Sequence, residues 1–154
     1  MFRNTGASTC GTLACALWAG GEMNKRPPDE RDCQFVSSRG ILKSCNVFPA
    51  VPVSSVRRVY DHDWQALAAG TIVYVHGSAI KDFCNRILPL LRVPIVLVSG
   101  DCDEVMPFEA FPAEREFQAF IEHPCIWHWF AQNLALDHRK CTRLAIGLDY
   151  HTLA

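Results

Sequence analysis

The tripeptide Asp101-Cys102-Asp103 carries the sharpest chemical signal in the chain, because it directly follows the apolar run 94–98. Two carboxylates one residue apart in a turn can bind one divalent cation, since hard cations such as Mn²⁺ and Mg²⁺ prefer oxygen ligands. Such a cation could carry the diphosphate of a nucleotide. Aspartates are also common in turns, where they hydrogen-bond to nearby backbone. Asp101 and Asp103 are therefore candidate metal ligands, and an ordinary turn is the alternative.

A second polar cluster, His76-Gly77-Ser78, follows the β-branched run 71–75. His76 could act as a general base or contact a phosphate, because an imidazole titrates near neutral pH. Gly77 would allow close backbone approach. Ser78 stands where a residue could cap a helix whose N-terminus favours anions. A turn histidine followed by a helix cap is the structural alternative.

These clusters belong to a regular alternation of strand-like and helical segments. Short apolar runs typical of strands occur at 34–36, 71–75, 94–98, 125–129 and 144–146. Helical periodicity predicts helices over 78–91, with Pro89 ending or kinking the last turn, over 113–122, and over 129–136. Strands that alternate with helices predict βαβ units and a parallel sheet. We therefore expect an α/β fold, a three-layer Rossmann-like domain with a mainly parallel sheet of about five strands.

The carboxyl ends of such strands are where an open parallel sheet binds its ligands. Polar or glycine residues follow four of the apolar runs, and they include Arg39, His76, Asp101 and Asp149. If the strands are parallel, all four clusters lie on the same edge of the sheet. The sequence does not give the strand order, so whether the clusters are adjacent stays open.

Length and composition fit one globular domain. The chain has 154 residues, a net charge of −1 and a hydrophobic fraction of 49%, which indicates a packed core and gives no sign of nucleic-acid binding. Residues 1–32, which end in a charged proline-bearing stretch, are expected to be an arm and linker, and residues 33–154 the α/β domain. None of the eight cysteines forms a C-x-x-C pair, which disfavours a zinc site or a disulfide framework.

No apolar run is long enough for a membrane span. Residues 10–21 have faint features of a signal peptide. A docked helical turn or an arm is the preferred interpretation, so a cytoplasmic location is expected. The motifs of P-loop nucleoside triphosphatases, dinucleotide oxidoreductases, zinc proteases of the H-E-x-x-H type and G-x-S-x-G hydrolases are missing from the sequence.

The strings 128–133 (HWFAQN) and 143–152 (RLAIGLDYHT) carry a family resemblance. Together with 35–45 (FVSSRGILKSC) and 96–103 (VLVSGDCD), they resemble exostosin-like and related uncharacterised glycosyltransferases, including those of large DNA viruses. The similarity covers about residues 33–153. Ala145 stands where the pattern has proline.

The resemblance implies one of two Rossmann-like lobes, with the sugar nucleotide bound mainly by the other lobe. The chain would then be an acceptor-side lobe, a truncated relative or a form that has lost activity. The expected activity is transfer of a sugar from a nucleotide-sugar to a carbohydrate acceptor. The alternative is a non-catalytic protein-interaction domain. If the chain is half of a larger design, we expect an exposed apolar face, which would favour self-association or a partner chain.

Combined with the strand-end clusters, the resemblance gives a set of candidate site residues. Asp101, His76 and Asp149 are the predicted catalytic residues, and Asp101 with Asp103 the predicted Mn²⁺ or Mg²⁺ ligands. The predicted substrate-binding residues are Arg39, Ser78, Asn133 and His151.

Overall fold

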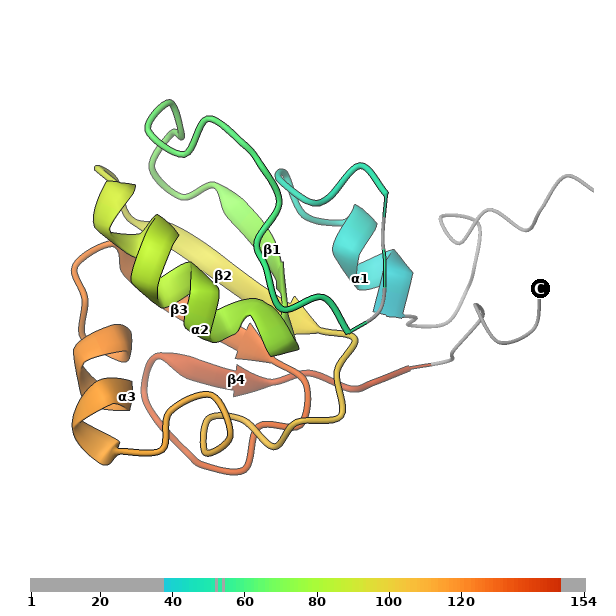
Figure 1. The fold of residues 1–154 in the computed structure, drawn as a ribbon, viewed down its shortest axis with the longest axis vertical. Coiled ribbons are helices and arrows are strands. Elements are labelled where there is room, and N and C mark those ends of the chain that lie inside the picture. The colour runs from blue at the N-terminus through green and yellow to red at the C-terminus, as the bar shows by residue number, and fades with distance from the viewer. Residues whose placement is uncertain (1–37, 52, 54, 148–154) are drawn as a thin grey trace, which may run out of the picture.

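A computed structural model describes residues 38–51, 53 and 55–147. At its centre is a sheet of four parallel strands in the order β1-β2-β3-β4 (Figure 1). The strands are β1 (Ile72–His76), β2 (Ile95–Gly100), β3 (Ile126–Ala131) and β4 (Cys141–Arg143). The expected α/β fold with a parallel sheet is confirmed.

One face of the sheet forms the main core. Side chains of Val73, Val75, Leu97 and Trp129 point to this face and are at most 1% exposed. The helices that cover it connect β1 to β2 and β2 to β3, as expected for right-handed crossovers between neighbouring parallel strands. Because β1 and β2 are also covered on their other face, their residues 72–75 and 95–98 are apolar instead of alternating with polar ones.

The first crossover, residues 77–90, is a continuous helical segment of changing pitch. It consists of a 3₁₀ turn η2 (Gly77–Ala79), α2 (Ile80–Asp82), a π-helical turn η3 (Phe83–Ile87) and a 3₁₀ turn η4 (Leu88–Leu90). Pro89 lies in the last turn, where the predicted helix was expected to end. The second crossover contains α3 (Glu114–Ile121), which confirms the helix predicted over 113–122.

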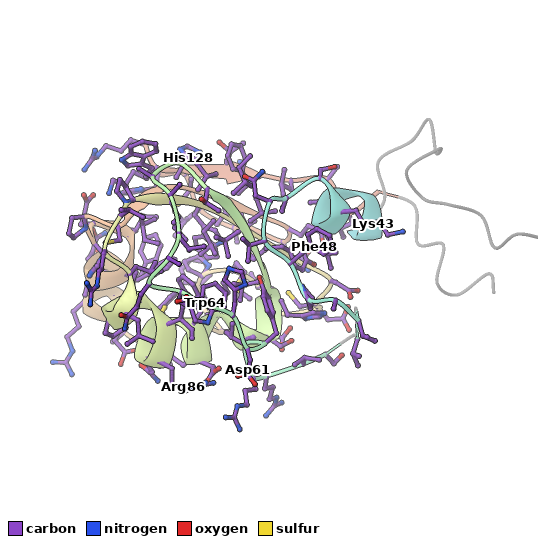
Figure 2. The ribbon with its side chains drawn as sticks, turned by 90° about the horizontal axis from the view of Figure 1, so that it is seen from above. Lys43, Phe48, Asp61, Trp64, Arg86 and His128 are labelled. Carbon is purple, nitrogen blue, oxygen red and sulfur yellow. The ribbon has the colours of Figure 1, made fainter. Side chains whose placement is uncertain are left out.

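The opposite face is covered near β1 and β2 by α1 (Ser38–Lys43). Leu42 and Cys45 pack there against Tyr74 and Val98. Figure 2 shows His128 on this side of the sheet, whereas Trp64 lies on the side of the crossover helices. The sheet therefore has helical segments against both faces.

Three sequence expectations differ from the structure. Residues 129–136 were expected to be helical, but β3 continues to Ala131 and a turn follows. The last strand is Cys141–Arg143 and not 144–146. Arg39 and Gly40 were expected in a loop after a strand, but they lie in α1. The aromatic residues of β3 are strand formers, and the sheet neighbours on both sides outweigh the weak helical periodicity.

The sheet has four strands within the part of the chain that is described, where about five were expected. Val47 adds one further parallel bridge, to Val73 on the outer edge of β1. The run 34–36, which was expected to be a strand, and the arm 1–32 lie outside the described residues. In the described ranges, no helix combines the length and the apolar character needed to cross a membrane.

Candidate active site

The carboxyl ends of β1 and β2 bring together two of the predicted catalytic residues. His76 is the last residue of β1, and Asp101 directly follows β2. The His76 Nε2 atom lies 3.0 Å from Asp101 Oδ2, with the two side chains 8% and 17% exposed. An ionised carboxylate only accepts hydrogen bonds, so Nε2 carries the proton and donates it to Asp101. In the neutral imidazole, Nδ1 then holds the basic lone pair.

The Nδ1 atom of His76 is buried and has no hydrogen-bond partner in the described structure. A buried nitrogen without a partner is costly, and such a group in a native fold points to a ligand, a water molecule or a catalytic role. The hydroxyl oxygen of Tyr74, two residues earlier on β1, is the other buried side-chain atom found without a partner among the described residues. Burial, together with the charge of Asp101, raises the pKa of Tyr74, so this phenol stays protonated.

Asp101 is held by Gln132, which sequence reasoning missed. Asp101 has a φ of 55°, and its backbone N–H donates to Gln132 Oε1 at 2.8 Å. Gln132 is 2% exposed, and its Nε2 donates to the carbonyls of Ala145 and Ile146. One buried amide thus joins the chain segments that follow β2, β3 and β4. Its only sequence signal is a polar residue directly after an aromatic strand.

A second contact between neighbouring strand ends involves Ser78. Its hydroxyl donates to Glu104 Oε2 at 2.9 Å, so the prediction that Ser78 caps the helix by a side-chain bond is wrong. Burial alone would raise the pKa of Glu104, but the bond from Ser78 and further hydrogen bonds lower it below its usual value. Glu104 is therefore an anionic acceptor three residues after Asp101, which with His76 forms the pair called the dyad below. Whether Ser78 binds substrate stays a prediction.

The backbone of Gly77, the residue after His76, packs tightly against the side chain of Cys102. A Cβ atom on Gly77 would lie 1.9 Å from Cys102 Sγ and 2.8 Å from its Cβ. We expect Gly77→Ala to lower the free energy of unfolding by about 1–3 kcal/mol, as overpacking in a close-packed site does. Urea denaturation would measure the loss, and adding Cys102→Ala, which removes the Sγ contact and keeps the Cβ contact, should restore part of it. An unchanged unfolding midpoint in Gly77→Ala would contradict this packing.

The thiols of Cys102 and Cys45 are not activated nucleophiles. Burial first, and the nearby Glu104 second, raise the pKa of Cys102 to about 12. Burial also raises the pKa of Cys45 to about 11. Because the thiolate is the reactive form, these side chains act as small apolar residues. The cysteines at positions 45, 84, 102, 125 and 141 are free.

Asp101 and Asp103, the predicted metal ligands, differ in their surroundings. The carboxylate of Asp101 contacts His76, and Asp103 is exposed to solvent. Within the described ranges, no three side chains of histidine, cysteine, aspartate or glutamate gather as a metal centre would require. These residues do not form a complete metal site, so the prediction stays a prediction and no chemical step is assigned to a metal.

The other predicted substrate-binding residues are placed in part. Asn133 has a φ of 53°, its Nδ2 donates to the Cys102 carbonyl at 2.8 Å, and its own carbonyl accepts from Met106. It therefore fixes the turn after β3 beside the loop after β2. The side chain of Arg39 and all of Asp149 and His151 lie outside the described residues.

No family model, curated protein or solved structure matches the chain. The interpretation of the site therefore depends on the geometry of His76 and its surroundings.

Next to the dyad lies a pocket that the sequence did not indicate. Its volume is about 220 Å³, and His76 forms part of its wall. The rest of the wall comes mainly from described residues between 49 and 60, namely Pro49, Val51, Val53, Val56, Arg58, Val59 and Tyr60. The Tyr60 hydroxyl donates to the Tyr74 carbonyl of β1 at 2.8 Å. No local pattern in this segment marks a binding site, because the pocket arises from its docking against β1.

Proposed function

We propose that this chain is the acceptor-side lobe of a glycosyltransferase that uses a nucleotide-sugar donor, and that His76 is its general base. The supporting observation is the His76–Asp101 pair, with Nε2 committed to the carboxylate at 3.0 Å and Nδ1 without a partner among the described residues. The pair lies at the carboxyl edge of a parallel sheet, where this fold class binds ligands.

In the proposed reaction the base is Nδ1 of His76, because Nε2 is hydrogen-bonded to Asp101. An acceptor hydroxyl donates to His76 Nδ1 and transfers its proton there while its oxygen attacks the anomeric carbon of the donor sugar. The bond between that carbon and the phosphate oxygen breaks, and the nucleoside diphosphate leaves with the electron pair. Asp101 stabilises the resulting imidazolium, because it already accepts the proton on Nε2. Burial of the imidazole excludes water from the base.

Positioning of the base is built into the fold. A base must hold its geometry closely to be effective, and Asp101 is fixed through its backbone bond to Gln132. Gln132 leaves no room beside Gly100, where an added Cβ would lie 2.5 Å from Gln132 Oε1. The orientation of the dyad thus depends on close contacts between the ends of β2 and β3.

Several residues proposed to act on the nucleotide-sugar donor lie outside the described residues. We propose that Asp149, His151 and Arg39 act on the nucleotide-sugar together with Asn133 and Ser78. A fifth strand would complete a three-layer Rossmann-like lobe. It would pair either next to Val47 on the β1 side of the sheet or next to β4 on the opposite side. A second lobe, or a second chain, would hold the diphosphate.

A non-catalytic interaction domain is the second candidate, and one observation favours it. Apolar side chains on the segments that follow β2 and β4 are exposed, with Val105 at 44%, Phe108 at 58% and Ile146 at 54%. Exposed large apolar side chains near one edge favour contact with another body. A second lobe and a separate partner protein would both cover them.

The proposal is tested by a transfer assay on the full chain. The chain is incubated with uridine and guanosine diphosphate sugars, with and without Mn²⁺, in the presence of simple sugars and small alcohols. We expect release of nucleoside diphosphate together with a glycosylated acceptor detected by mass spectrometry. Absence of product with every donor and acceptor would contradict the enzyme proposal and favour the interaction domain.

A further inference from the structure

The pocket beside His76 has a wall whose chemistry identifies what it could bind. Val56, Val59, Val75 and Ala79 supply apolar surface, and the last three are at most 3% exposed. Arg58 is the charged side chain in the wall, and it is exposed to solvent. The buried part of the wall is therefore mainly apolar. Its polar side-chain groups are the imidazole of His76 and the hydroxyl of Tyr60, which already donates to the Tyr74 carbonyl.

The size of the pocket limits the ligand. Its volume is about 220 Å³, whereas an apolar cavity of about 150 Å³ holds one benzene ring. Drug-sized ligands occupy about 300–1,000 Å³. One six-membered ring with a short substituent, or a branched alkyl group of similar volume, fits this space. A sugar of that size carries several hydroxyl groups, and the valine and alanine side chains offer them no partner, so each would lose its hydrogen bonds to water.

We propose that this pocket binds a small aryl or alkyl alcohol, with its apolar group against the valine side chains and its hydroxyl on Nδ1 of His76. The alcohol supplies the partner that the buried Nδ1 lacks in the described structure. Because Nδ1 is closed to solvent here, binding requires side-chain rotations in the pocket wall, which are common at binding sites. That this alcohol is the acceptor for sugar transfer depends on the function proposed above. The binding itself does not.

The test is a nuclear magnetic resonance titration of the full chain with benzyl alcohol and with toluene, which lacks the hydroxyl. Both should shift the methyl signals of Val56, Val59 and Val75. The ratio of the benzyl alcohol affinity to the toluene affinity should fall by about threefold to tenfold in His76→Phe, the loss expected for one net hydrogen bond. An unchanged ratio, or no shift of these methyl signals by either compound, would overturn the proposal.

A pair of tryptophan variants keeps the test independent of His76. Val56→Trp should fill the pocket and abolish the methyl shifts caused by both compounds. Val105→Trp adds the same side chain at an exposed site outside the pocket wall, and binding should stay within twofold of the unmodified chain. Equal binding in the two variants would place the ligand elsewhere and overturn the proposal.

The outcomes separate the pocket from the proposed function. Binding of benzyl alcohol in the pocket without any sugar transfer would keep the pocket inference and contradict the enzyme. Transfer to a glycan with no binding in the pocket would keep the enzyme and contradict the pocket inference. Formation of benzyl glycoside by the unmodified chain, and its loss in Val56→Trp, would support both.

Discussion

Replacing His76 with glutamine should lower the turnover of sugar transfer by about 10²–10⁴-fold, the usual contribution of a positioned general base. Glutamine can still hydrogen-bond to Asp101, but its amide cannot accept a proton from the acceptor hydroxyl. The loss should appear in kcat and leave KM for the donor nearly unchanged, because residues other than His76 are proposed to bind the donor. Initial rates at varied donor concentration would separate the two parameters.

Asp101→Asn should lose nearly as much activity as His76→Gln, for a different reason. The carboxylate of Asp101 forces the proton onto Nε2 and leaves Nδ1 basic. An asparagine amide can donate to Nε2, which moves the ring proton to Nδ1 and removes the base. A carboxylate that acts only as a distant charge would give a much smaller loss on neutralisation.

Matched controls define what would contradict the dyad. His128→Gln changes a histidine inside β3, away from the carboxyl ends of the strands, where its Nε2 lies 2.8 Å from Thr142 Oγ1. Asp137→Asn changes an aspartate whose side chain is 90% exposed. Both should keep activity within about twofold. An equal loss in Asp103→Asn and Asp101→Asn would instead favour the metal-binding prediction, and full activity in His76→Gln would exclude His76 as the base.

The pairing of His76 with Asp101 was accessible from the sequence for a simple reason. Both residues directly follow apolar runs that had to be strands, and parallel neighbours place their carboxyl ends together. What the sequence could not supply was the strand order. The structure places β1 beside β2, with His76 opposite Gly100 in the register, so the two side chains meet.

Gln132 shows why the rest of the site could not be predicted. The sequence predicts a helix over 129–136, and within a helix a glutamine is an ordinary surface residue. Its role appears only once β3 runs to Ala131 and the segments after β2 and β4 pass on either side, offering a backbone N–H and two carbonyls. Such long-range backbone contacts leave no local pattern in the sequence.

The two tryptophans of β3 illustrate the same limit in the core. Trp127 and Trp129 are two residues apart, so a regular strand would place both on one face. In the structure Ile126 pairs with Ile95 and His128 pairs with Val96, which leaves Trp127 as an extra residue. Such a bulge shifts the alternation of faces. As a result Trp129 is 0% exposed and Trp127 is 53% exposed.

Trp129→Ala should therefore lower the free energy of unfolding by about 3–5 kcal/mol, as expected for truncating a buried aromatic side chain. The indole packs edge-on against Phe120 with the ring centres 5.2 Å apart, and its Nε1 donates to Ser99 Oγ at 2.9 Å. Both contacts disappear, and the Ser99 hydroxyl is left buried without this donor. A loss of this size is a large part of the stability of an ordinary domain.

Trp127→Ala is the matched control, because it removes the same side chain from the same strand. It should cost less than about 1 kcal/mol, as most exposed substitutions do, although the indole also covers Gly70. Urea denaturation followed by far-ultraviolet circular dichroism measures both variants without relying on tryptophan fluorescence. Similar losses in the two variants would mean that both indoles are buried on one face, and hence that the bulge at Trp127 is absent. The register that brings the end of β3, and with it Gln132, beside Asp101 would then be wrong as well.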